Sequence, residues 1–329
     1  MKRAFTEVSR PDTGGDIAIF APFTRLWCVE RFFDSLAASD VPFERSRFVA
    51  YIDHDDQAIV DAVRKRVLEI PFAEVVVHCT AWQPPAEFAR SRERRGRHGA
   101  MRCASVGLIP QTSEYLLLLE DDTTVPAKVW EYSTQAMKKG YDWVSGFEVG
   151  RWSCPCPGLW RFEDYALTTP MPGSEPLVEV DATGIFCVLT RPSVYASVKW
   201  DVWDTEWGHD VSITYELKRK GYRLAVDWRL TCTHMTQDGD LTCDMAQPLT
   251  RRVGGYNPLL QAYPNLTPME SFTARGPKLN HRKPTSDTTF YRLPEDVTFD
   301  GVLYPKRTRV PRSIAKLMYE DGLISRVVL

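Results

Sequence analysis

Two hydrophobic periods alternate along the first 245 positions of the chain. Short apolar runs, as in buried strands, are followed by segments whose apolar residues recur three and four positions apart, as on one face of a helix. The strand-like segments are 16–23, 47–52, 73–78, 116–119, 142–148, 178–190 and 222–228. The helix-like segments are 25–39, 57–68, 100–109, 127–139 and 209–220. Alternating strands and helices predict an α/β fold, with a mixed, mainly parallel sheet flanked by helices.

The segment 115–126, Y-L-L-L-L-E-D-D-T-T-V-P, is the most informative of these. Its four consecutive leucines are typical of a strand buried on both faces. Glu120, Asp121 and Asp122 follow directly, and Pro126 prevents the strand from continuing. Because three adjacent carboxylates repel one another, their place at a strand end indicates a compensating Mg²⁺ or Mn²⁺. The alternative is an acidic turn that only caps the next helix.

A basic segment at 87–102 precedes this strand and surrounds two glycines. It is either a solvated loop or an anion cradle, since arginines and helix N-termini are common phosphate ligands. Its basic residues are Arg90, Arg92, Arg94, Arg95, Arg97, His98 and Arg102.

The segments after residue 150 carry aromatic and polar features. Residues 151–169 read as an irregular loop, and Gly184 inside the strand-like segment 178–190 suggests a bulge or the close approach of a ligand. Asp210 opens a helix that Gly221 ends, and His234 follows the last strand. Five tryptophans either stack on sugar faces or belong to the core: Trp152, Trp160, Trp200, Trp203 and Trp207.

From residue 246 the chain becomes rich in proline. We therefore expect a catalytic domain at 1–245 and an extension at 246–329. The extension either packs on the core or mediates assembly, for example of a homo-oligomer. Only 314–319 reads as helical there.

Composition narrows the class of protein. The 329 residues are 43% hydrophobic with a formal net charge of −2, which disfavours a generic nucleic-acid binder. No apolar stretch is long enough to span a bilayer, and the N-terminus lacks the apolar segment of a signal peptide, so we expect a cytoplasmic protein. The eight cysteines lack zinc-site spacing and are expected to be reduced.

Taken in order, these motifs resemble the GT-A glycosyltransferases, in particular the family 2-like group, over residues 16–236. In that family the first strand ends in a Pro–aromatic–polar step beside the nucleoside, an Asp closes the second strand, and a D-x-D motif binds nucleotide and metal. A later acid opens a helix, and a His follows the next strand. The matching residues are Pro22, Phe23, Thr24, Asp53, Glu120, Asp121, Asp122, Asp210 and His234.

The resemblance implies a metal-dependent, hexosyltransferase-type transfer from a UDP- or GDP-linked sugar to an acceptor hydroxyl. It places Mn²⁺ or Mg²⁺ on Glu120, Asp122 and His234. The donor would contact Pro22, Phe23, Thr24, Asp53, Arg97, Arg102 and Asp121. Asp210 would be the general base of an inverting reaction. Glu120 in place of Asp and His209 in place of an acid depart from the family pattern, and the second departure leaves Glu206 open as the base.

Two other functions remain open. A nucleotidyltransferase would be expected to carry a glycine-rich loop with a Lys after the first strand, whereas this chain has A-P-F-T-R at 21–25. A carbohydrate-binding or assembly protein could keep the fold without the chemistry. The acceptor stays open among a glycan, a protein and a small molecule, and the arginine-rich segment also admits a nucleic acid.

Overall fold

The structure is a computed structural model, and its description covers most of the first 252 residues. The described residues are 5–9, 16–52, 56–80, 101–151, 155–163, 166–200, 209–246, 250–252, 290–292, 297–299, 302–304 and 309–311. The chain divides into two compact units, Met1–Ala274 and Arg275–Leu329.

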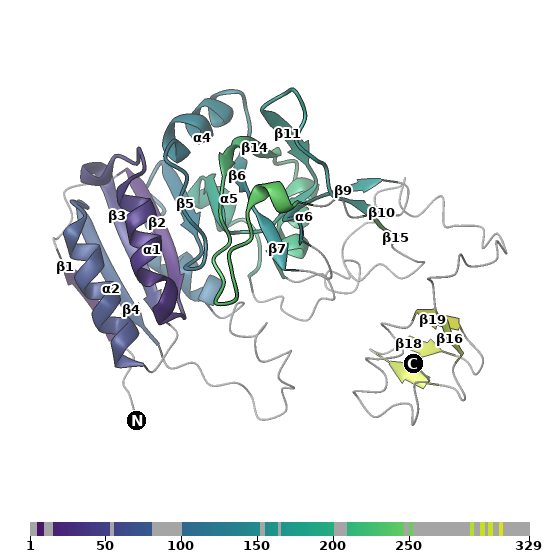
Figure 1. The fold of residues 1–329 in the computed structure, drawn as a ribbon, viewed down its shortest axis with the longest axis horizontal. Coiled ribbons are helices and arrows are strands. Elements are labelled where there is room, and N and C mark those ends of the chain that lie inside the picture. The colour runs from purple at the N-terminus through teal and green to yellow at the C-terminus, as the bar shows by residue number, and fades with distance from the viewer. Residues whose placement is uncertain are drawn as a thin grey trace. The chain divides into compact units, whose positions relative to one another are not determined.

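A nine-stranded sheet forms the centre of the first unit (Figure 1). Its order is β1 (Phe5–Ser9), β4 (Glu74–Cys79), β3 (Ser46–Ile52), β2 (Ile17–Phe23), β5 (Tyr115–Leu119), β13 (Cys187–Thr190), β6 (Trp143–Phe147), β14 (Leu224–Thr231) and β11 (Leu177–Val180). Strands β4, β3, β2, β5, β6 and β14 run in one direction, and β1, β13 and β11 run against them. The predicted α/β class with a mixed, mainly parallel sheet is confirmed.

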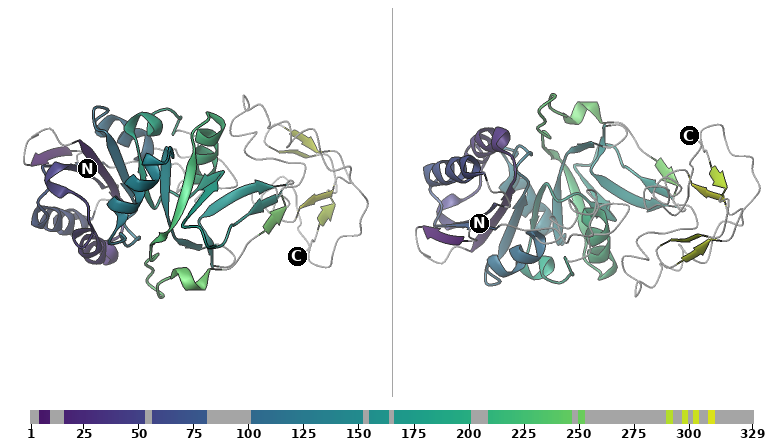
Figure 2. Two further views of the ribbon diagram at one scale, coloured as in Figure 1. Left: turned by 90° about the horizontal axis from the view of Figure 1, so that it is seen from above. Right: turned by 90° about the horizontal axis from the view of Figure 1, so that it is seen from below.

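Helices cover both faces of this sheet, and Figure 2 shows them from above and below. One face packs against α1 (Leu26–Ala37), α2 (Gln57–Glu69) and α4 (Val129–Lys138). The other packs against the helical residues 101–108, α5 (Pro192–Tyr195) and α6 (His209–Arg219). Strand β5 divides its leucines between the two cores, with Leu117 and Leu119 on the first face and Leu116 and Leu118 on the second. The leucine run therefore forms a strand buried on both faces, as predicted.

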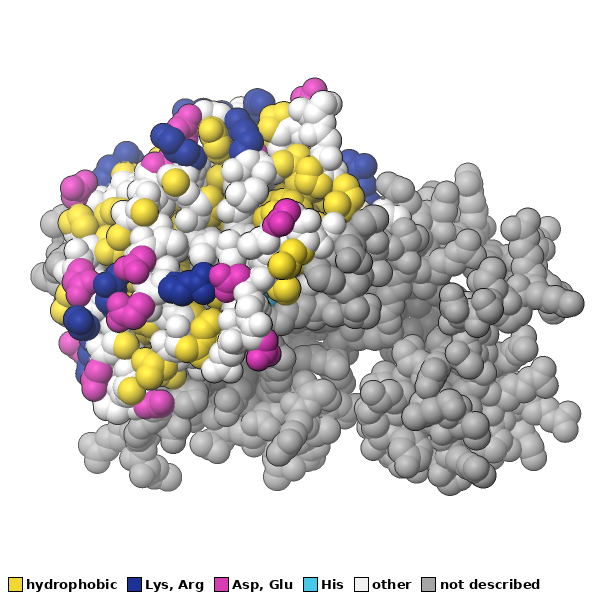
Figure 3. Space-filling model, in the orientation of Figure 1, with side chains coloured by type: hydrophobic (Ala, Val, Ile, Leu, Met, Phe, Trp, Pro, Cys, Tyr) yellow, Lys and Arg dark blue, Asp and Glu magenta, His cyan; other side chains and the backbone are white. Residues whose placement is uncertain are grey.

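Charged side chains tie the outer surfaces of α1 and α2 together. Arg66 of α2 lies 3.3 Å from Glu30 and also pairs with Asp34, both on α1. Asp56 caps α2, because its carboxylate accepts a hydrogen bond of 2.9 Å from the Ala58 amide. On the face drawn in Figure 3, basic and acidic side chains are interspersed, so no field of a single sign covers the described surface there.

A second, four-stranded sheet occupies part of the segment predicted to be an irregular loop. It contains β12 (Ala182–Thr183), β9 (Leu159–Glu163), β10 (Ala166–Thr168) and β15 (Thr250–Arg252). A short hairpin of β7 (Val149–Arg151) and β8 (Pro155–Pro157) precedes it. The loop prediction for 151–169 was therefore wrong, because pairing with distant strands outweighs the local proline content.

The predicted single strand 178–190 is also wrong, since it divides into β11, β12 and β13 in two sheets. Asp181 interrupts it and accepts a hydrogen bond of 2.9 Å from the Phe162 amide of β9. Gly184 lies at the next break, where the Phe186 ring, rather than a ligand, approaches it closely. Trp160 and Trp200 are buried, so these two tryptophans belong to the core.

The described part of the second unit consists of two antiparallel strand pairs. They are β16 (Phe290–Arg292) with β19 (Arg309–Pro311), and β17 (Val297–Phe299) with β18 (Val302–Tyr304). The helix expected at 314–319 lies outside the described residues. Among the helices that are described, none is both long enough and apolar enough to cross a membrane.

Candidate functional site

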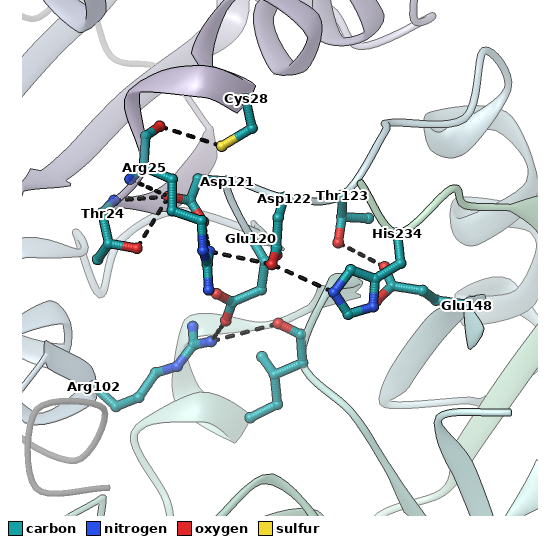
Figure 4. Close-up of polar contacts among 11 residues, drawn as sticks. Thr24, Arg25, Cys28, Arg102, Glu120, Asp121, Asp122, Thr123, Glu148 and His234 are labelled. Carbon is teal, nitrogen blue, oxygen red and sulfur yellow. Dashed lines mark hydrogen bonds and ion pairs between the residues drawn. The ribbon is translucent and has the colours of Figure 1, made fainter. Parts of the chain in front are cut away.

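Polar residues gather where the co-directional strands end, at one edge of the central sheet (Figure 4). Thr24 and Arg25 follow β2, and Glu120, Asp121 and Asp122 follow β5. Glu148 follows β6, and His234 lies three residues beyond β14. This edge is the ordinary ligand-binding edge of an open α/β sheet.

Asp121 fastens the end of β5 to the turn between β2 and α1. Its Oδ2 accepts hydrogen bonds from the Thr24 amide at 2.7 Å, the Arg25 amide at 3.1 Å and the Thr24 hydroxyl at 3.2 Å. Its Oδ1 pairs with the Arg25 guanidinium. The side chain is 1% exposed, so its carboxylate organises the turn rather than facing solvent.

Glu120 turns the other way and pairs with Arg102, whose side chain is completely buried. Arg102 also donates a 3.4 Å hydrogen bond to the Ile185 carbonyl. Burial raises the pKa of Glu120 above its usual range, and the positive charge of Arg102 opposes that rise. In this arrangement the Arg102 guanidinium holds Glu120 and does not reach a diphosphate in solvent.

Asp122 faces two cationic groups with a single oxygen. Its Oδ2 lies 3.2 Å from Arg25 Nη1 and 3.4 Å from His234 Nε2. On the far side of the ring, His234 Nδ1 lies 3.1 Å from Glu148 Oε1. Burial lowers the pKa of His234, but its bonds to Asp122 and Glu148 outweigh this and raise that pKa to about 10. Asp122 and His234, predicted as partners from the sequence, are thus brought together.

Backbone pairing explains this meeting of residues from two distant strands. The Met235 amide donates to the Asp122 carbonyl at 2.7 Å, and the Thr124 amide donates to the Thr233 carbonyl at 3.0 Å. Thr123 and His234 form the antiparallel bridge between these bonds. Three residues on each side are therefore held in register.

Asp210 lies in the first turn of α6 and is partly exposed. Its negative charge raises the pKa of Glu120 and of Arg102, which places it in the same electrostatic neighbourhood as both. The Asp210 carboxylate therefore lies within electrostatic range of Glu120 and Arg102.

Several other predicted site residues have different surroundings. The Phe23 ring stacks on Phe33 in the core at 5.5 Å between centroids, so it does not face a nucleotide. Pro22 is buried within β2. Asp53, Arg97 and Glu206 lie outside the described residues, as do Trp152, Trp203 and Trp207.

Sequence reasoning missed Arg25 and Glu148. Arg25 lies two residues after β2, and Glu148 follows β6 directly. The predicted residues Glu120, Asp121 and Asp122 likewise follow an apolar strand. A systematic search of polar residues after each predicted strand would have included both.

The donor set fits a divalent cation only in part. Asp122 offers a carboxylate oxygen and His234 offers Nε2, which suit Mn²⁺. Glu120 is engaged with Arg102 instead. Over the described ranges, no three His, Cys, Asp or Glu side chains converge as a metal shell. Bound water and the donor's phosphates would have to complete the coordination.

Comparison with known proteins gives structural matches only. No family model matches the chain, and no curated protein matches it. A197 from STIV matches with a TM-score of 0.41 and 13% identity, covering 71% of this chain and 93% of that one. TarS 1-349 from S. aureus matches with a TM-score of 0.43 and 15% identity, covering 64% of this chain and 57% of that one.

The mannosyltransferase PcManGT from Pyrobaculum calidifontis, solved with GDP-Man and Mn²⁺, matches with a TM-score of 0.42 and 10% identity. The match covers 64% of this chain and 56% of that one, so the chain spans little more than half of TarS 1-349 or PcManGT.

Proposed function

We propose that this chain is a metal-dependent glycosyltransferase that moves a sugar from a nucleoside-diphosphate sugar to an acceptor hydroxyl. The observation that carries the proposal is the pairing of Asp122 with His234 at 3.4 Å on the ligand-binding edge of the sheet. Asp210 supplies a further, partly exposed carboxylate in the same neighbourhood.

Asp122 and His234 are the residues that would hold Mn²⁺ or Mg²⁺. When bound, the cation would act as a Lewis acid that neutralises the charge of the departing nucleoside diphosphate. Arg25 is placed to add a second positive charge, since its side chain is 29% exposed and lies beside Asp122. Thr24, Asp53 and Arg97 remain our expected contacts for the rest of the donor.

The transfer itself needs a base for the acceptor. The hydroxyl oxygen attacks the anomeric carbon, the bond from that carbon to the phosphate oxygen breaks, and the diphosphate leaves with the electron pair. Asp210 would take the hydroxyl proton, with inversion at the anomeric carbon. Glu206 remains the alternative base.

A screen of UDP- and GDP-linked sugars with Mn²⁺ tests the proposal, with release of the free nucleoside diphosphate as the readout. We expect at least one donor to be hydrolysed slowly, and Asp122→Asn to abolish the release. Asp240→Asn is the matched control. Asp240 precedes Leu241, which forms a β-bridge with His234, but its carboxylate pairs with Arg31.

Two results would contradict the proposal. One is hydrolysis that survives Asp122→Asn unchanged. The other is release of pyrophosphate from a nucleoside triphosphate and a sugar phosphate with no activity on any nucleotide sugar, which would identify a nucleotidyltransferase.

A further inference from the structure

A buried carboxylate lies behind the candidate metal-binding histidine. Glu148, in the bend between β6 and β7, is 4% exposed. Its Oε1 lies 3.1 Å from His234 Nδ1, and its Oε2 accepts a 2.6 Å hydrogen bond from the Thr123 hydroxyl. Both oxygens therefore have partners, and the carboxylate is fixed at both ends (Figure 4).

The neighbours of His234 determine which ring nitrogen carries the proton. Nδ1 lies near Glu148 Oε1 and 3.2 Å from the Val149 carbonyl oxygen. A carbonyl can only accept, so Nδ1 must be the donor in this contact. Nε2 is then the nitrogen directed at Asp122, and it is the one available to a metal ion once its own proton is lost.

We propose that Glu148 is a positioning residue that holds the His234 ring with Nε2 directed at the Asp122 carboxylate, ready to ligate a divalent cation. The inference rests on the proposed function, because it assigns Asp122 and His234 to that cation. Carboxylates that accept from the far nitrogen of a metal-binding histidine fix its tautomer and orientation.

The surrounding contacts favour this role over a purely structural one. The bridge between Thr123 and His234 already fixes the backbone on both sides, so Glu148 is not needed to join the two segments. A neutral glutamine could accept the Thr123 hydrogen bond equally well. Glutamine could not, however, place a negative charge beside His234 Nδ1. A buried carboxylate such as Glu148 stays ionised only where a partner compensates its charge, and His234 is that partner.

Glu148→Gln tests the proposal because it keeps the shape and removes the charge. The readouts are the binding of Mn²⁺ alone, followed by electron paramagnetic resonance of the free ion, and the imidazole nitrogen resonances of His234 in the metal-free protein. His234→Gln assigns those resonances. Glu74→Gln is the matched control, since Glu74 is also buried, at 5% exposed, but pairs with Arg47 on the neighbouring strand β3.

We expect Glu148→Gln to weaken Mn²⁺ binding about 10- to 100-fold and to shift the imidazole nitrogen resonances of His234. Glu74→Gln should change only the melting temperature. If Glu148→Gln does not fold, Thr123→Val frees one oxygen of Glu148 and should shift the same resonances.

Unchanged Mn²⁺ affinity together with unchanged His234 resonances in a folded Glu148 variant would overturn the proposal. Failure of the proposed function looks different. If the wild-type protein binds no Mn²⁺, the cation assignment fails, and the nitrogen resonances of the metal-free protein alone decide whether Glu148 orients the ring.

Discussion

Arg25 Nη1 lies 3.2 Å from Asp122 Oδ2, the oxygen that also faces His234. The same guanidinium nitrogen pairs with Asp121. Arg25 thus stands between two adjacent carboxylates and neutralises part of their charge without a metal. Although burial lowers the pKa of Arg25, the charges of Asp121 and Asp122 raise it overall, so this cation does not lose its proton at neutral pH.

Replacing Arg25 by methionine should therefore strengthen the binding of Mn²⁺. It should also lower the stability of the metal-free protein. Removing one nearby positive charge should raise the Mn²⁺ affinity about tenfold, equivalent to about 1.4 kcal/mol. The measurement is the rise in melting temperature on adding Mn²⁺, which should be larger in the variant. Arg31→Met is the control on the adjoining helix α1, since Arg31 pairs with the more exposed Asp240 at 2.6 Å. If Mn²⁺ raises the melting temperature equally in the wild type, Arg25→Met and Arg31→Met, Arg25 and the metal do not compete.

A second prediction concerns how much the buried pair of Arg102 and Glu120 contributes to the stability of the protein. Arg102→Met leaves the half-buried Glu120 carboxylate without its cation, and Glu120→Gln leaves a buried guanidinium without its anion. Each single change should lower the free energy of unfolding by about 3 kcal/mol. The double variant should recover much of that loss, because a buried ion pair is often replaceable by neutral residues. Urea denaturation measures all four proteins, and strictly additive losses would mean that the two charges do not stabilise each other.

A third prediction concerns the close approach of Gly184 to Phe186. A Cβ on Gly184 would lie 2.6 Å from Phe186 Cε1, and the Phe186 carbonyl accepts a 3.0 Å hydrogen bond from the Glu120 amide. Gly184→Ala should therefore displace Phe186 and cost about 1–3 kcal/mol of stability. It should also reduce any Mn²⁺-dependent activity, since the shift reaches the acidic cluster through that hydrogen bond. Gly173→Ala is the control, because nothing lies within 4 Å of its added Cβ. Equal melting temperatures for the two variants would contradict this interpretation.

Local patterns were sufficient for much of the fold and for the position of the site. The leucine run at 116–119 predicted a doubly buried strand, and β5 divides its side chains between two cores as that pattern requires. The acidic cluster was expected at a strand end on the ligand-binding edge because the carboxyl ends of parallel strands meet there. The resemblance to the GT-A glycosyltransferases placed His234 near it, and His234 lies beside Asp122.

The remaining features depend on pairing between distant residues, which a single sequence does not encode locally. The segment 178–190 reads as one strand, but it divides where Asp181 bonds to β9 and where Gly184 meets Phe186. Arg102 was interpreted as a phosphate ligand because it ends a basic segment. It instead lies against Glu120, a pairing that only the packing of residues 101–108 on the sheet reveals.

The last prediction separates donor binding from proton transfer and concerns Asp210. Asp210→Asn keeps the shape of the side chain in the first turn of α6, but it cannot take a proton at neutral pH. Nucleoside diphosphate affinity with Mn²⁺ should therefore stay near that of the wild type, while turnover should fall by about 10²- to 10⁴-fold. Glu216→Gln is the control on the same helix, because Glu216 pairs with Arg219 at 3.5 Å.

Glu206→Gln tests the alternative base. If Glu206→Gln abolishes transfer while Asp210→Asn remains active, the base is Glu206. If both variants remain active with intact donor binding, the reaction uses no enzyme base, and retention of configuration at the anomeric carbon becomes the better hypothesis.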